Sequence, residues 1–352
     1  MRPKPPMTEL YVTNFNRNYT GVSATAAGVL RQQVGQFDLA LVGHPLPGAP
    51  APITKAEAKR RSRRAPPGRP FAIWHVRRNP EMQTAIWARD VLRLPIRIVF
   101  TSAAQRLHSA FPRWLISRMD AVIATTERAA EFVPHVRAVV PHGVDAARYV
   151  PAPDRAAAWA ATGFPGTRGI ATIGRIRPEK GTDVFVSALI RALPELPDVT
   201  ALVLGKATRQ HEGFLAEQKA RLAAAGLADR VIFPGELSPD DMARLLPALD
   251  LCVQLPRYEG YGLAPLEAMA AGVPLLASEA GFFRHFTQGG ANGIVVPVEA
   301  ADQAAEAMVA LLRAPDRLAA MAAHARRDAA QLFSIEREAA GIAEVYDALW
   351  RG

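Results

Sequence analysis

The sequence lacks the features that mark several classes of protein. Its one cysteine among 352 residues, Cys252, excludes a disulfide framework and a cysteine-based zinc cluster. No run approaches 18 uncharged apolar residues, so no helix is expected to span a membrane. The N-terminus, MRPKPPMTEL, lacks the apolar segment of a secretory signal, so we expect the protein to be cytoplasmic.

Composition and length favour an ordinary globular protein with two domains. Hydrophobic residues make up 49% and charged residues 21%, which excludes a disordered or fibrous chain. A chain of 352 residues fits two domains at roughly 100–200 residues each. Such a chain buries enough apolar surface to fold without disulfides or metal.

Positive charge is concentrated in the first half. Residues 1–150 hold 22 Lys and Arg against 9 Asp and Glu, a net charge of +13, whereas residues 151–352 carry −4. The densest stretch, 53–70, is expected to attract polyanions such as nucleic acid or an anionic membrane, or else to be a solvated loop. The residues expected to dock on a membrane are Lys59, Arg60, Arg61, Arg63 and Arg64.

Apolar strand candidates alternate with amphipathic helix candidates, which is typical of parallel α/β sheets. Strands are expected in two series, at 9–14, 38–43, 71–76, 97–102, 121–126 and 137–142, then at 169–175, 200–205, 230–235, 250–256 and 273–278. The segment 143–168 is rich in proline and glycine, as a linker is. We predict two doubly wound domains, 1–150 and 151–334, facing a central cleft, with a helix in 335–352 that packs on either domain, the N-terminal one being favoured.

The segment RYEGYGLAPLEAMAAGVPLLAS (257–278) carries the clearest signal of chemistry. Glu259 and Glu267 are separated by seven residues, with Gly260-Tyr261-Gly262-Leu263 leading into a helix between them. Free N–H groups at a helix start suit phosphate, and carboxylates suit sugar and ribose hydroxyls. A plain strand-loop-helix turn is the alternative, but Glu267 among apolar residues needs a partner. The segment therefore predicts a nucleotide-sugar site.

A second segment, GRIRPEKGTD (174–183), follows the strand at 169–175. Arg175 and Lys180 flank a loop broken by Pro178 and Gly181, and both could reach one diphosphate, Arg as a fork and Lys as a point charge. Alone, such a loop is typical of a solvated turn. Together with the glutamate segment about 80 residues downstream, it indicates a diphosphate site.

These two motifs closely resemble those of the retaining glycosyltransferases of family 4, which have the GT-B fold of two Rossmann-like domains. VVPHGVD (139–145) is similar to the family's domain junction. NYTGVSAT (18–25) resembles its glycine loop, with Gly21 as the match and Val22 where many members have a second glycine. By this resemblance Arg175 and Lys180 hold the donor diphosphate, Glu259 contacts the sugar and Glu267 the ribose. The implied donor-binding set is Gly21, Arg175, Lys180, Glu259, Gly260, Tyr261, Gly262, Leu263 and Glu267.

The N-terminal half resembles the lipopolysaccharide-core mannosyltransferases of Gram-negative bacteria, in 71–82, 89–125 and PHGVD (141–145). This resemblance implies transfer of mannose from GDP-mannose to the inner Kdo of a lipid A–Kdo acceptor at the cytoplasmic face of the inner membrane. An anionic acceptor in a membrane would explain the positive first half. The alternative is a family 4 transferase that uses UDP-glucose, UDP-galactose, UDP-GlcNAc or another membrane glycolipid.

Many family members place a histidine after the fourth strand, where this chain reads Phe100-Thr101-Ser102. His75 is then the candidate that faces the donor sugar or the acceptor, with a structural histidine as the alternative. Arg77, Arg78 and Asn79 are expected to line the acceptor side, or else to form an exposed basic turn. The expected catalytic residues are Glu259, Arg175, Lys180 and His75.

Metal-dependent transferases of the other common fold hold their cation with an Asp-x-Asp pair, and this sequence has none. We therefore expect no metal and no other cofactor. The departing GDP is expected to be stabilised by Arg175, Lys180 and the amides of 260–263. No covalent nucleophile stands out, which favours front-face attack with retention of configuration.

Two other classes remain as alternatives. A nucleic-acid-binding protein would use the basic half, but neither half has a helix-turn-helix, zinc or RRM motif, so no nucleic-acid partner is expected. A nucleotide-sugar epimerase or a sugar phosphorylase would keep the fold and change the chemistry. The pairing of GRIRPEKG with the two glutamates argues against both classes.

Overall fold

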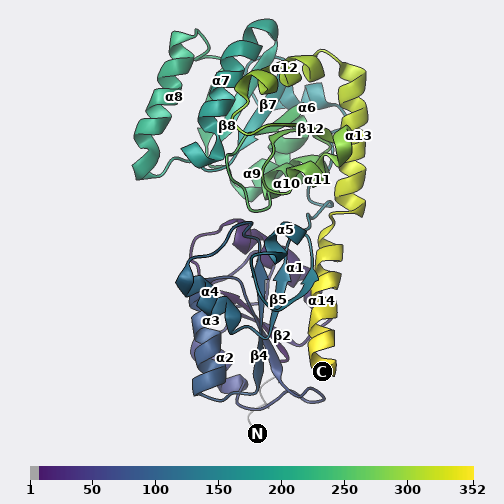
Figure 1. The fold of residues 1–352 in the computed structure, drawn as a ribbon. Coiled ribbons are helices and arrows are strands. Elements are labelled where there is room, and N and C mark those ends of the chain that lie inside the picture. Colours follow the sequence, from purple (N-terminus) through teal and green to yellow (C-terminus); the bar gives the residue numbers. More distant parts are fainter. Residues whose placement is uncertain (1–7) are drawn as a thin grey trace. The chain divides into compact units, whose positions relative to one another are not determined.

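The computed structural model describes residues 8–352 and divides the chain into two units (Figure 1). Unit 1 comprises residues 1–143 and 333–352, and unit 2 comprises residues 144–332. The chain thus passes between units at 143/144 and 332/333, a few residues before the boundaries expected from the sequence. Within residues 8–352, no helix has the length and apolar character needed to cross a membrane.

Unit 1 is built on a parallel six-stranded sheet whose strands are short apolar runs. The order is β2 (Leu39–Gly43), β1 (Leu10–Asn14), β3 (Ala72–Val76), β4 (Ile96–Ser102), β5 (Ala121–Ala124) and β6 (Val136–Val139). All residues of β1 and β3 are buried, as expected for central strands covered on both faces. The order reverses direction between β1 and β3, and ligands of such sheets bind at the carboxyl ends beside this point.

Helices cover both faces of this sheet. One face packs against α1 (Gly21–Gln33) and α14 (Ile335–Arg351). The other face packs against α2 (Lys55–Arg61), α3 (Asn79–Ile86) and α4 (Ala110–Ser117), while the short α5 (Glu127–Ala130) follows β5. The C-terminal helix α14 therefore completes the first unit (Figure 1). Its residues Ile342, Tyr346 and Trp350 lie in the core of that unit.

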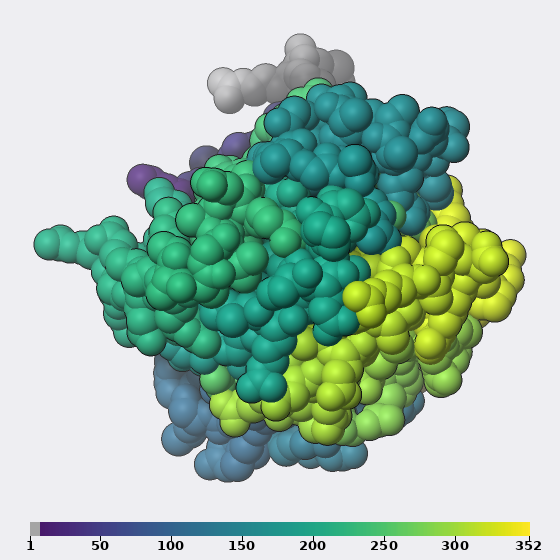
Figure 2. Space-filling model, turned by 90° about the horizontal axis from the view of Figure 1, so that it is seen from above, coloured from purple at the N-terminus to yellow at the C-terminus, as the bar shows by residue number. Residues whose placement is uncertain are grey.

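Unit 2 has a second parallel sheet with the strand order of a dinucleotide-binding fold. The order is β12 (Gly293–Val296), β11 (Leu275–Ser278), β10 (Leu251–Gln254), β7 (Arg168–Ile173), β8 (Val199–Leu204) and β9 (Val231–Gly235). Its helices are α6 (Arg155–Ala161), α7 (Thr182–Ala192), α8 (Glu212–Ala224), α9 (Pro239–Leu245), α10 (Leu263–Ala270), α11 (Phe283–Phe286), α12 (Ala301–Leu312) and α13 (Pro315–Gln331). Seen from above, α12 and α13 form one surface with α7 (Figure 2). The reversal point lies between β7 and β10.

Several elements were not expected from the sequence. The helix α6 lies inside the predicted linker, and β12 and α13 follow the last predicted strand. The basic stretch that could have been a loop contains α2, which buries only Ala58. This helix is held locally, because the Thr54 side chain caps it and Glu57 pairs with Arg60 and Arg61.

Candidate functional site

The residues of unit 2 that were expected to bind the donor lie where the sheet order reverses, at the carboxyl ends of β7 and β10. The loop after β7 passes directly against the end of β10 at Gly181. That residue has φ 68°, and a Cβ there would lie 1.8 Å from the Leu255 carbonyl oxygen. A glycine is therefore required at this approach. The approach places the Lys180 Nζ 2.5 Å from the Glu259 Oε2.

Arg257 fixes the position of this loop. Its guanidinium donates to both carboxylate oxygens of Asp183, at 2.8 and 2.9 Å, and to the Pro178 carbonyl at 2.6 Å. Burial alone would raise the pKa of Asp183, but the hydrogen bonds from Arg257 outweigh burial and lower it. Arg257 was not singled out in the sequence, because its partner Asp183 lies 74 residues away.

Glu259 and Arg175 differ in what they contact. The Glu259 carboxylate accepts from Lys180 and, at 3.0 Å, from the Gly260 N–H, so it is half-buried and oriented. Arg175 is exposed, and its guanidinium contacts no hydrogen-bond partner among residues 8–352. Arg175 is therefore available to an anion, whereas Lys180 would share its charge between Glu259 and a ligand.

The start of α10 opens beside this pair. Gly262 has φ 105°, and a Cβ there would lie 2.3 Å from the Phe283 ring, so the tight entry to the helix needs glycine. No side chain caps this end of the helix. Tyr261 is 3% exposed and stacks on Phe282 with ring centroids 5.1 Å apart. The Tyr261 ring therefore packs inside unit 2, and its backbone carbonyl accepts from the Phe282 N–H at 3.0 Å.

Glu267 lies one turn further along α10. Burial raises the pKa of its carboxyl to about 7, although a hydrogen bond from Tyr149 and the charge of Arg148 oppose this shift. The half-buried acid thus has the partner that the sequence required, and that partner is Tyr149. Sequence reasoning missed Tyr149 because it precedes Pro151 in a segment that reads as linker.

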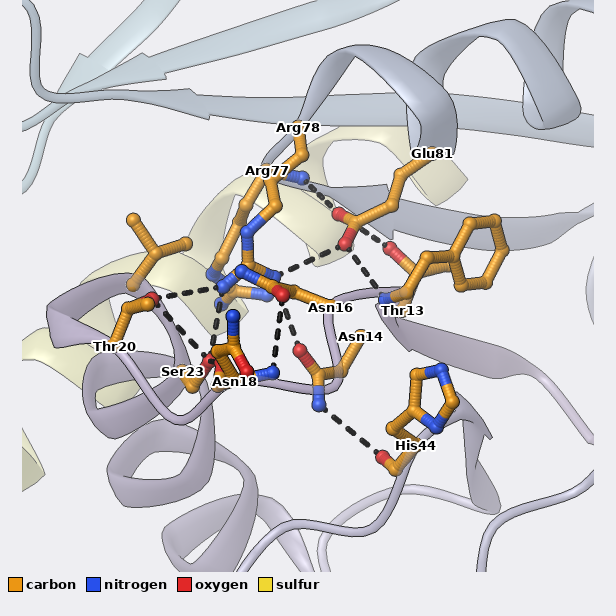
Figure 3. A network of polar contacts seen from close by, with 12 residues as sticks. Thr13, Asn14, Asn16, Asn18, Thr20, Ser23, His44, Arg77, Arg78 and Glu81 are labelled. Carbon is orange, nitrogen blue, oxygen red and sulfur yellow. Dashed lines mark hydrogen bonds and ion pairs between the residues drawn. The ribbon is translucent and has the colours of Figure 1, made fainter. Parts of the chain in front are cut away.

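Unit 1 has its own polar network at the reversal point between β1 and β3 (Figure 3). Its centre is Glu81, which is fully buried on α3. Glu81 accepts hydrogen bonds from the Thr13 hydroxyl, the backbone N–H groups of Phe15 and Arg77, and the Arg78 guanidinium, at 2.8–3.2 Å. Sequence reasoning missed this residue, whose role depends on donors from two segments, 13–15 and 77–78.

Arg78 ties this network to the predicted glycine loop. Its guanidinium donates to Asn14 Oδ1 at 3.0 Å, to Thr20 Oγ1 at 3.1 Å and to Ser23 Oγ at 2.9 Å. Gly21 is the first residue of α1 and is exposed. Both terminal nitrogens of Arg78 are thus engaged by protein partners, and the side chain positions the loop around Gly21.

His75 does not face a ligand, contrary to the expectation from the sequence. It is 0% exposed, its Nδ1 pairs with the Tyr346 hydroxyl, and its Nε2 lies 2.7 Å from Thr101 Oγ1. Burial holds the pKa of His75 well below its usual value, which keeps the ring neutral. Both ring nitrogens are used inside the core, so His75 is a structural residue.

The residues after His75 do not form an exposed basic turn. Arg77 is 9% exposed, Arg78 is half-buried and Asn79 alone is exposed, as the first residue of α3. The expected membrane-docking residues lie on α2 and just after it. Lys59 sits over the Trp87 ring at 4.6 Å, Arg60 and Arg61 pair with Glu57, and Arg63 and Arg64 are exposed.

The part of the chain that the structure describes contains no cluster of side chains that could hold a metal ion. No three side chains from His, Cys, Asp and Glu gather there as a metal site would require. Cys252 is buried, and burial raises the pKa of its thiol to about 12, so it packs as a small apolar residue.

Comparison with known proteins agrees with this geometry. The profile of the family "Glycosyl transferases group 1" matches residues 160–328. The chain is 40% identical over 348 residues to the lipopolysaccharide core biosynthesis mannosyltransferase LpsB of Rhizobium meliloti (strain 1021), covering 97% of this chain and 98% of that protein. It is 38% identical to LpcC of Rhizobium leguminosarum bv. viciae, a protein of the same description, covering 97% and 96%.

Solved structures agree on the fold. Anabaena Alr3699/HepE, solved with UDP and glucose, superimposes with a TM-score of 0.83 at 17% identity, covering 97% of this chain and 100% of that one. The C-terminal domain of LpcC from Francisella tularensis superimposes with a TM-score of 0.53 at 32% identity, covering 55% of this chain and all of that domain. The predicted GT-B fold is confirmed. The chain belongs to the group 1 glycosyltransferases, within the group that contains the mannosyltransferases of lipopolysaccharide core biosynthesis.

Proposed function

We propose that this protein transfers mannose from GDP-mannose to the inner Kdo of a lipid A–Kdo acceptor. The observation that carries the proposal is the similarity to two core mannosyltransferases along the whole chain, which includes unit 1 as well as the donor motifs of unit 2. An acceptor with carboxylates and phosphates also suits the charge of unit 1. That unit holds 23 Lys and Arg against 12 Asp and Glu, while unit 2 is slightly negative.

In the proposed reaction, the donor diphosphate lies at the open start of α10. Arg175 binds it as a free guanidinium, and Lys180 contributes a charge that Glu259 holds in place. These groups and the backbone amides of Gly262 and Leu263, at the start of α10, stabilise the negative charge that develops on the departing GDP. Glu259 accepts from the sugar hydroxyls and Glu267 from the ribose.

We propose that this step needs no metal and retains the anomeric configuration. Two cationic side chains beside a helix start supply the counter-charge for a diphosphate. The acceptor hydroxyl would attack from the face that the diphosphate leaves, and the departing phosphate oxygen would take its proton. The products are the mannosylated acceptor and GDP, and no covalent enzyme intermediate is needed.

The same proposal places the protein at the cytoplasmic face of the inner membrane. Besides the basic residues of α2, the helix α4 on the same face of the sheet exposes Phe111 and Trp114 by 52% and 53%, and their rings stack with centroids 6.2 Å apart. Leu107, just before this helix, is 60% exposed. Exposed aromatic rings beside arginines suit the interface of an anionic bilayer.

The test of the proposed function is a donor and acceptor panel. The purified protein is incubated with lipid A–Kdo in detergent and with GDP-mannose, UDP-glucose, UDP-galactose or UDP-GlcNAc in turn. Mass spectrometry should show the addition of one hexose from GDP-mannose alone. Transfer from a UDP-sugar instead, or transfer to an acceptor without Kdo at the same rate, would contradict the assignment.

A further inference from the structure

The arginine that follows β3 in unit 1 carries a buried charge without a hydrogen-bond partner. Arg77 is nine-tenths buried, and its Nη1 is fully buried with no partner. Within residues 8–352, its guanidinium makes no hydrogen bond or ion pair with another side chain. A guanidinium that leaves water and finds no acceptor is costly to the fold.

The carboxylates near Arg77 are already used by other donors. Glu81 accepts from Thr13, Phe15, Arg78 and the Arg77 backbone, as described above. Glu338, on α14, accepts from His142 Nδ1 at 2.7 Å and from the Gly143 N–H at 2.8 Å. Tyr346 also lies close, but burial raises the pKa of its hydroxyl, so it stays neutral. The nearby carboxylates thus stabilise the charge of Arg77 only weakly, and none of them accepts a hydrogen bond from its guanidinium.

Arg77 lies where a ligand of this sheet would bind. It follows β3, one of the two strands at the reversal point, and the next two strands of the sheet, β4 and β5, end in further unpartnered polar groups. The Ser102 hydroxyl at the end of β4 and the Thr125 hydroxyl just after β5 are buried without partners. A cation and two hydroxyls at adjacent carboxyl ends match an anionic, hydroxyl-bearing ligand.

We propose that Arg77 binds a carboxylate of the acidic sugar in the acceptor, as a bidentate pair. This inference rests on the proposed function and adds the subsite that recognises the acceptor. The planar fork of arginine suits both carboxylate and phosphate. The carboxylate is favoured because unit 2 already supplies Arg175 and Lys180 for the donor diphosphate. Arg78, by contrast, donates from both terminal nitrogens to protein groups and is a positioning residue.

The first test compares two acceptors, lipid A–Kdo and the same glycolipid with its Kdo carboxylates methyl-esterified. The wild-type enzyme should prefer the free acid by about 10-fold or more in kcat/KM, the size expected for a charged hydrogen bond. Arg77→Gln should lose most of that preference. The KM for GDP-mannose, measured by its hydrolysis without acceptor, should not change. Arg137→Gln, which alters an exposed arginine on β6, serves as the matched control.

Two results would overturn the inference. A preference for the free acid that persists in folded Arg77→Gln would make Arg77 a structural charge. A higher KM for GDP-mannose with an unchanged acceptor preference would assign the guanidinium to the donor diphosphate. Should Arg77→Gln fail to fold, Arg77→Lys keeps the charge and loses the fork, and it should lose part of the preference. An unchanged preference in Arg77→Lys would also overturn the inference.

A binding experiment separates this inference from the proposed transfer reaction. Free Kdo, its methyl ester and inorganic phosphate are titrated into the full chain and followed by NMR. Free Kdo should bind the wild type more tightly than the other two probes and should not bind Arg77→Gln. Equal binding of phosphate would assign the site to phosphate and overturn the inference. If Kdo binds through Arg77 but GDP-mannose gives no transfer, the proposed donor fails and the subsite stands.

Discussion

The Lys180 ammonium and the Glu259 carboxylate lie 2.5 Å apart although 79 residues separate them in the chain. Each follows one of the two strands at the reversal point of unit 2, so the pair exists because β7 and β10 are neighbours. Arg257 and Gly181 hold the two loops together at this place. The pair therefore depends on the positions of both loops at this edge of the sheet.

Lys180→Ala should lower kcat/KM by on the order of 10²-fold or more, because it removes a charge from the diphosphate and unpairs Glu259. The fold should survive, since the side chain lies on a loop and is 22% exposed. Steady-state kinetics and thermal unfolding check both points. Lys219→Ala, which alters an exposed lysine on α8, should behave like the wild type. Normal turnover in folded Lys180→Ala would remove the loop from the diphosphate site.

The raised pKa of Glu267 predicts a pH-dependent stability. An unfolded glutamate titrates near 4.3, whereas burial raises the pKa of Glu267 to about 7 in the folded protein. Between these pH values the folded state thus binds more protons than the unfolded state. The free energy of unfolding is therefore lowered by Glu267 increasingly as pH rises from about 4 to about 7, and by a constant amount above pH 7. Below about pH 4 the carboxyl is neutral in both states and this effect vanishes.

Glu267→Gln should therefore be as stable as the wild type at pH 4 and more stable at pH 8. The gain should be at most about 4 kcal/mol, and less because the residue is partly exposed. Urea unfolding at the two pH values measures this difference. Donor affinity should fall in the same variant, since a ribose hydroxyl loses its carboxylate acceptor. An equal stability difference at both pH values would show that the carboxyl titrates normally.

His75→Ala should cost stability rather than chemistry. It leaves a cavity and unpairs Tyr346 and Thr101 in the core of unit 1, for a loss of roughly 2–4 kcal/mol. Turnover per folded molecule should stay within about threefold of the wild type at a temperature where the variant is folded. Tyr346→Phe should destabilise in the same direction by a smaller amount. A 100-fold loss of kcat in folded His75→Ala would restore the catalytic role.

The features that could be predicted from the sequence are those that depend on residues close together in the chain. The strands are apolar runs, and the two motifs of unit 2 are short, so the sequence alone could single out Arg175, Lys180, Glu259 and Glu267 as candidates for the donor site. Contacts between distant segments were not found. The acceptor role of Glu81 depends on Thr13, Phe15 and Arg78, and that of Tyr149 depends on Glu267, so neither has a local signal. The burial of His75 likewise depends on α14, which joins this sheet from the far end of the chain.

Transfer should survive removal of divalent metal. Arg175 and Lys180 are expected to supply the charge that a cation would otherwise provide, so EDTA should change kcat by less than about twofold. The measurement uses enzyme dialysed against EDTA and then supplied with magnesium or manganese. Loss of activity on chelation with recovery on re-addition would contradict the metal-free mechanism.

The free energy of membrane binding should have an electrostatic contribution from α2 and an apolar contribution from α4. Each Lys or Arg near an anionic surface contributes roughly 1 kcal/mol within a Debye length. Arg60 and Arg61 share the carboxylate of Glu57, which offsets part of their charge, whereas Arg63 and Arg64 are exposed. Changing these four arginines to Gln should weaken binding to anionic vesicles and should flatten its dependence on salt.

The apolar part is tested on α4. Phe111→Ser with Trp114→Ser should lower binding by about 10-fold at every salt concentration, because ring insertion is not screened by ions. Hydrolysis of GDP-mannose should be unchanged in both variants, since their residues lie outside the donor site of unit 2. Arg209→Gln with Arg317→Gln, which alter exposed arginines of unit 2, is the matched control. If both variants bind vesicles like the wild type, α2 and α4 are solvated surfaces and the acceptor is reached by another face.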